Sequence, residues 1–209
     1  MKTFARIAVA AAVAAALVPS ALGQMKSSPP DLRSDMRKLW EDHVTWTRLF
    51  IVSALADLPD KQATTDRLLK NQVDIGNAIK PFYGDAAGNK LSALLKDHIL
   101  IAADIVADAK TGDTTKLGTD KARWVANADD IAGFLSAANP KNWPAADMKK
   151  MMREHLDATT AELMARINKD WAADVAAYEK VHAQILHMAD MLTDGIAKQF
   201  PEKVKDRAA

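Results

Sequence analysis

The chain of 209 residues contains no cysteine, which limits both how it can be stabilised and what chemistry it can carry. Disulfide bonds are excluded, so packing must hold the fold, and thiolates are removed from any set of metal ligands or nucleophiles. An excess of one charge is also lacking, since 28 Lys and Arg stand against 27 Asp and Glu. This balance favours neither nucleic acid nor an anionic membrane as a partner.

Long apolar runs are absent except at the N-terminus, where Lys2 and Arg6 flank the start of an apolar stretch from Ile7 to Val18. Followed by Pro19-Ser20 and small residues, this pattern predicts a signal peptide over residues 1–23 and export to the periplasm or the cell exterior. The apolar stretch is shorter than the roughly 17–25 residues of a membrane-spanning helix. No later segment is apolar enough, so we expect no membrane span after the signal peptide is removed.

The remaining chain is predicted to be all-α, because apolar residues recur every three or four positions and no segment alternates strictly. Residues 24–31 are expected to form a flexible leader, 32–199 a helical bundle domain, and 200–209 a disordered tail. Proline, glycine and asparagine clusters separate the expected helices. We place six helices at residues 32–57, 60–80, 87–110, 119–137, 145–168 and 171–199.

A weak internal triplication is the most informative feature of the sequence. Asp42-His43, Asp97-His98 and Glu154-His155 place a histidine after a carboxylate in three expected helices, with the histidines 55 and 57 residues apart. Each histidine also shares a stripe with apolar residues three or four positions away, so all three should face the core. The six helices therefore pair into three tandem αα-hairpins of about 56 residues.

A second series lies on the returning helices. Asn71, Asn127 and His182 are separated by 56 and 55 residues, and Asp74 and Asp130 follow the two asparagines by three positions. His187 is an alternative to His182, because the two lie about 140° apart around a helix and cannot both point at one centre. Both series fall at a similar depth, which predicts a polar layer midway along the bundle.

Imidazoles and carboxylates inside a helical bundle are the donors that a divalent metal site would use. The candidate ligands are His43, His98, His155, one of His182 and His187, and Glu162 as the nearest inward carboxylate. Zinc, iron or copper would suit such donors. The histidines can meet only in a closed bundle around a pseudo-threefold axis. The residues expected around the ligands are Asn71, Asp74, Asn127 and Asp130.

Two alternatives to a non-catalytic, metal-binding exported protein stay open. The layer can be purely structural, with each histidine hydrogen-bonded to its own neighbour and no cofactor bound, in a protein that acts through an interaction. It can also supply a general acid and base to an enzyme. However, no nucleophile motif, phosphate-binding glycine loop or dinucleotide fingerprint is present. The sequence identifies no partner.

The segments 39–48, 96–100, 128–131 and 187–191 resemble a family of uncharacterised exported bacterial helical proteins, and the resemblance spans the whole mature domain. It implies a helical fold and an exported location, without a particular chemistry. The first expected helix is also similar to metal-binding DinB-type four-helix bundles, through Leu39-Trp40-Glu41 and residues 54–59.

Overall fold

The computed structural model describes residues 31–208, and within this range the chain is all-α, as predicted, with no strand. The expected signal peptide lies outside the described residues, as does the leader except for its last residue. No helix in the described range is long and apolar enough to cross a membrane. The helices are α1 (Leu32–Leu55), α2 (Lys61–Tyr83), α3 (Asp85–Thr111), α4 (Thr114–Ala138), α5 (Ala145–Ile167), α6 (Trp171–Gln199) and the short α7 (Pro201–Ala208).

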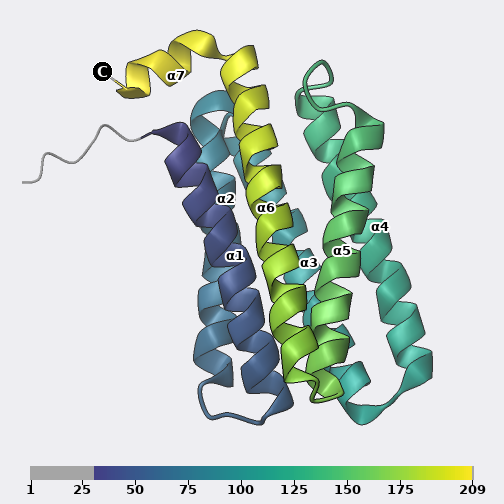
Figure 1. Ribbon diagram of the computed structural model, residues 1–209. Coiled ribbons are helices and arrows are strands. Elements are labelled where there is room, and N and C mark those ends of the chain that lie inside the picture. The colour runs from purple at the N-terminus through teal and green to yellow at the C-terminus, as the bar shows by residue number, and fades with distance from the viewer. Residues whose placement is uncertain (1–30, 209) are drawn as a thin grey trace, which may run out of the picture.

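The six long helices form a closed bundle of three αα-hairpins (Figure 1). Each helix packs against the next along the chain, and α6 packs back against α1, so the ring has no open side. Helices α1, α3 and α5 also contact one another. The first helix of every hairpin therefore faces a shared centre, which is the arrangement in which the repeated histidines can meet.

Side-chain caps fix where three of the helices begin. Asp31, Asp113 and Asp170 each accept a hydrogen bond from a backbone N–H in the first turn, at 3.2, 3.0 and 3.0 Å. These caps satisfy N–H groups that have no partner within the helix. At the other end of α3, Gly112 adopts a left-handed conformation with φ 75°, which glycine reaches without steric cost.

Three predicted helix breaks lie inside helices instead. Pro81 is in the last turn of α2, where the loss of one backbone N–H removes a single hydrogen bond. Gly88 and Gly118 lie in the first turns of α3 and α4, and helices tolerate glycine there at modest cost. The connection between α2 and α3 is therefore only Gly84, at φ 84°.

The C-terminal segment predicted as a disordered tail contains α7. Pro201 is its first residue, a position where the missing N–H of proline costs nothing. The ring of Phe200 lies 5.9 Å from that of Phe82 and 5.2 Å from that of Tyr83, and Lys203 Nζ donates to Pro81 O at 2.9 Å. These contacts hold the start of α7 against the end of α2.

Helices α2 and α3 cross at two glycines, and this contact gives a testable prediction. A Cβ atom on Gly76 would lie 2.4 Å from Gly88 O and 2.0 Å from Ser92 Oγ. A backbone oxygen cannot move away unless the helices separate, so Gly76→Ala should lower the free energy of unfolding by about 1–3 kcal/mol in urea titrations.

Gly133 is the matched control, because it is an exposed glycine in α4 whose added Cβ would meet nothing within 4 Å. Gly133→Ala should raise the free energy of unfolding by about 0.5–1 kcal/mol through helix propensity alone. If both alanine variants were stabilised, the close crossing of α2 and α3 would be refuted.

Candidate functional site

Three histidines from the three hairpins lie together in the core. His43 on α1, His98 on α3 and His155 on α5 are 3%, 2% and 4% exposed. The ring of His155 is between the other two, with centroid distances of 5.7 Å to His43 and 6.3 Å to His98. We call these three side chains the imidazole layer. The triplicated sequence pattern thus corresponds to a triplicated structure.

Each returning helix contributes a side-chain amide that bridges to the helix before it. The amide nitrogen donates to the backbone carbonyl four residues before the histidine of the same hairpin, which joins the two helices at the level of the layer. These hydrogen bonds run from Asn71 to Leu39 at 3.0 Å, from Asn127 to Leu94 at 3.1 Å, and from Gln184 to Met151 at 3.1 Å.

Two of these amides also orient an imidazole. Nδ1 of His98 lies 2.9 Å from Asn127 Oδ1, and Nδ1 of His155 lies 3.1 Å from Gln184 Oε1. Because the amide nitrogens donate to carbonyls, the amide oxygens must be the atoms that face the rings, and an amide oxygen only accepts. Nδ1 therefore carries the proton in both rings. The lone pair of the neutral imidazole is left on Nε2.

The first hairpin departs from this pattern. Asn71 Oδ1 accepts from Gln72 Nε2 at 3.2 Å instead of from a histidine. Gln72 lies beside His43, yet Gln72 Oε1 and His43 Nδ1 are both buried without a hydrogen-bond partner, as is Trp40 Nε1. His43 is therefore the ring in the layer that no hydrogen bond holds in one orientation.

Burial keeps the imidazole layer neutral. It lowers the pKa of His98 to about 3 and that of His155 to about 4, from an ordinary value of 6.5, and hydrogen bonds from the amides offset only part of this effect. Burial also places the pKa of His43 well below 6.5, and the neighbouring rings of His155 and His98 lower it further. All three rings thus have an unprotonated nitrogen at neutral pH.

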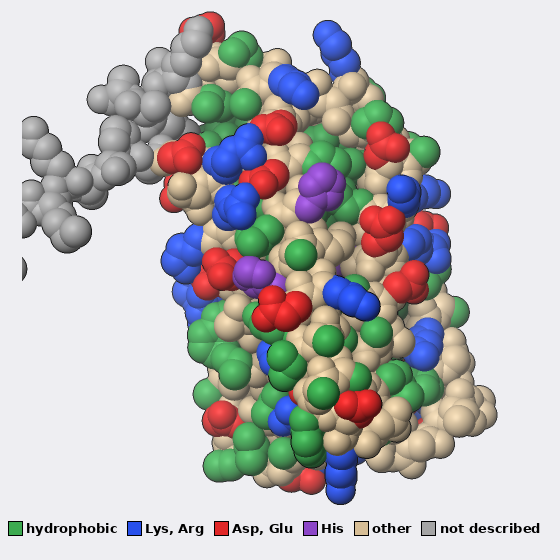
Figure 2. Space-filling view, viewed as in Figure 1, with side chains coloured by type: hydrophobic (Ala, Val, Ile, Leu, Met, Phe, Trp, Pro, Cys, Tyr) green, Lys and Arg blue, Asp and Glu red, His purple; other side chains and the backbone are tan. Residues whose placement is uncertain are grey.

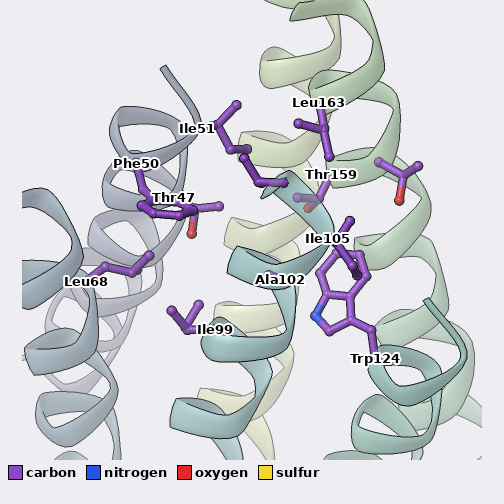
Figure 3. A pocket seen from close by; sticks show the side chains of 12 residues that line it. Thr47, Phe50, Ile51, Leu68, Ile99, Ala102, Ile105, Trp124, Thr159 and Leu163 are labelled. Atoms are coloured by element: carbon purple, nitrogen blue, oxygen red, sulfur yellow. The ribbon is translucent and has the colours of Figure 1, made fainter. Parts of the chain in front are cut away.

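A small apolar cavity of about 20 Å³ lies one helical turn beyond the layer (Figure 3). Thr47, Ala102 and Thr159, each four residues after one of the three histidines, contribute to its wall. Trp124 also lines it, with its ring centroid 5.1 Å from that of His98 and its indole nitrogen unpaired. The other apolar side chains around the cavity include Phe50, Ile51, Leu68, Ile99, Ile105 and Leu163.

The predicted places of His182 and His187 in the layer need correction. His182 is partly exposed, with Nε2 3.1 Å from Glu41 Oε1, and His187 is exposed on the face shown in Figure 2. Gln184 takes the inward position, and a residue two places away on a helix points about 200° from it. Near His187 the buried side of α6 is formed by Met188.

Asp74 and Asp130 are likewise outside the layer, whereas Asn71 and Asn127 are at it. Asp74 accepts a hydrogen bond from Lys70 Nζ at 2.7 Å on the surface, and Asp130 is exposed. Three residues beyond each asparagine, the helix has turned about 60° from the inward direction, which brings these carboxylates to solvent.

Glu162 is buried as predicted but belongs to a different cluster, two turns along α5 from His155. Arg48 donates to Glu162 Oε1 at 2.7 Å and to both oxygens of Asp174 at 2.9 and 3.1 Å. Arg166 donates to Asp174 Oδ2 at 2.9 Å. We call Arg48, Glu162, Arg166 and Asp174 the ion network; it joins α1, α5 and α6, and the sequence analysis identified only Glu162 among its members.

The ion network shifts its carboxyl groups in opposite directions. Burial raises the pKa of Glu162, and the contact with Arg48 offsets only part of this. Burial acts in the same direction on Asp174, but hydrogen bonds from Arg48 and Arg166 outweigh it and bring the pKa below its ordinary value. Asp174 is thus held as a carboxylate by two guanidinium groups.

Comparison with protein-family models, curated proteins and solved structures finds no match. Within residues 31–208, no group of three or more His, Cys, Asp or Glu side chains is arranged to hold a metal ion as the structure stands. The imidazole layer, the amides around it and the adjoining cavity are therefore the features from which a function has to be argued.

Proposed function

We propose that this protein binds one divalent metal ion, such as zinc, iron or copper, between His43, His98 and His155. The observation that supports the proposal is the amide contact at Nδ1 of two rings, which leaves the Nε2 lone pair free to coordinate. Hydrogen bonds of this kind, from the second ring nitrogen to a protein oxygen, orient and strengthen histidine ligands in metal proteins. Here Asn127 and Gln184 supply those oxygens.

Binding requires a small contraction of the layer. Three imidazoles that share an ion at a metal–nitrogen distance of about 2.0–2.1 Å would have ring centroids about 5–5.5 Å apart. The measured distances to His155 are 5.7 and 6.3 Å, so the rings have to approach by less than about 1 Å. His43 is the ring that can turn most readily, because its Nδ1 has no partner.

The chemistry of the layer supports binding rather than acid–base catalysis. Glu162, the buried carboxylate expected beside the histidines, is engaged by Arg48 in the ion network. The layer therefore contributes imidazole and amide groups, which suit a coordination site. With the predicted signal peptide, the ion would be bound in the periplasm or outside the cell.

Metal analysis of protein purified without a histidine tag tests this function. We expect one zinc ion per chain by mass spectrometry and calorimetry. His98→Ala and His155→Ala should each weaken zinc binding by more than about 100-fold, while Asn127→Ala, which removes an orienting group, should weaken it by about 10–100-fold.

His182→Ala and His187→Ala serve as controls, because both side chains lie away from the layer. These variants should bind zinc like the parent protein. If the folded parent chain, checked by circular dichroism, binds no zinc, iron or copper, the metal proposal is wrong and the layer is a structural set of hydrogen bonds.

A further inference from the structure

The cavity beside the imidazole layer is aligned with it. Thr47 Oγ1 donates to His43 O at 2.8 Å, and Thr159 Oγ1 donates to His155 O at 2.9 Å, so both hydroxyl hydrogens are engaged by the helix backbone. The same two threonines line the cavity. The cavity wall therefore begins one turn from two of the proposed metal ligands, on the inside of the bundle.

One polar group in this wall has no partner. Trp124 is 4% exposed, its indole nitrogen forms no hydrogen bond, and Figure 3 shows that nitrogen turned toward the space between the lining side chains. An N–H group buried without an acceptor is unfavourable, and such groups are rare in folded proteins. An occupant of the cavity with a lone pair would satisfy it.

The size of the cavity limits that occupant. A volume of about 20 Å³ admits about one water molecule or a similarly small species. An ion held by three imidazoles also keeps a position open for a further ligand, as zinc sites with three protein ligands do. We propose that a molecule or anion of two or three atoms binds in this cavity, completes the coordination of the ion, and accepts a hydrogen bond from Trp124 Nε1. This inference rests on the proposed metal site.

Azide titration of the cobalt(II)-loaded protein tests the inference, because the visible spectrum of cobalt reports a change of ligand. Azide should change that spectrum in the parent protein. Trp124→Phe should raise the azide dissociation constant about tenfold or more, which is the effect of removing one hydrogen bond to a charged acceptor. The cobalt affinity should stay within a few-fold of that of the parent.

Trp40→Phe is the matched control. Trp40 is also 4% exposed, its indole nitrogen is also unpaired, and its ring lies 5.7 Å from that of His43, but it does not line the cavity. Its replacement should leave azide binding unchanged.

The possible failures are distinguishable. Cobalt binding without any azide response would overturn the small-ligand site and leave the metal site intact. An equal loss of azide affinity in the two tryptophan variants would overturn the role of Trp124. A folded parent chain that takes up no cobalt would overturn both proposals together.

Discussion

Replacing Arg48 by methionine is expected to lower the free energy of unfolding by about 3–5 kcal/mol. Arg48 is the residue that joins the two carboxylates of the ion network, whose side chains are each only 2% exposed. Without it, Glu162 has no cation within hydrogen-bond distance and Asp174 keeps only Arg166. Leaving a charge buried and unpaired costs far more than the net contribution of the intact pair. Urea unfolding at pH 7 measures the difference.

Arg123→Met is the control for this prediction. Arg123 pairs with Asp120 and Asp104 on the surface, where its side chain is 54% exposed. Solvent screens such a pair, so the free energy of unfolding should change by no more than about 1 kcal/mol. Arg48→Lys should fall between the two, because an ammonium group cannot reproduce the two-pronged contact with Asp174. Similar losses for Arg48→Met and Arg123→Met would contradict the burial of the ion network.

The sequence predicts the bundle because its signals are local. Apolar spacing gives the helices, and the histidine–carboxylate repeat places His43, His98 and His155 on the buried face of the first helix in each hairpin. What the repeat could not decide was whether the three helices converge. That depends on closure of the ring by α6 against α1, a contact between the two ends of the domain.

The returning helices show where residue identity misleads. The sequence analysis extended the series of Asn71 and Asn127 to His182, because histidine is a better ligand than an amide. The structure continues it with Gln184, whose carbonyl partner lies 33 residues earlier, as that of Asn127 does. A search for any side-chain amide 29 residues after each repeated histidine would have found Gln184, and Gln72 with it.

The ion network carries no comparable signal. Arg48, Glu162 and Asp174 come from three helices, and no regular spacing in the sequence relates them. Arg48 and Asp174 also look like ordinary surface charges when read alone. Their pairing follows from the way α1, α5 and α6 pack, so it becomes visible only once the fold is known.

Acidification from pH 6.5 to pH 4 is expected to destabilise the protein by several kcal/mol. In the folded chain burial holds the pKa of His98 near 3 and that of His155 near 4, whereas an unfolded chain takes up protons at each histidine near 6.5. The unfolded state therefore binds more protons between these values, and stability falls as the pH falls. At about 1.4 kcal/mol per pH unit, each of the two rings contributes about 3 kcal/mol by pH 4.

A loss of this size is comparable with the total stability of a typical domain, about 5–15 kcal/mol, so the bundle should unfold near pH 4. Urea titrations at intervals between pH 7 and pH 4 give the slope of stability against pH. Carboxylates also titrate at the lower end of this range, so a variant has to isolate the histidine contribution. His155→Gln removes one buried imidazole while keeping an N–H group that can reach Gln184.

The slope for His155→Gln should be smaller by up to about 1.4 kcal/mol per pH unit between pH 6.5 and pH 4, corresponding to one proton fewer. His187→Gln, which replaces an exposed imidazole, should leave the slope unchanged. An unaltered slope in His155→Gln would mean that this ring already takes up its proton in the folded protein. In that case its Nε2 would carry no lone pair at mildly acidic pH, so the same experiment also bears on whether the layer can hold a metal ion there.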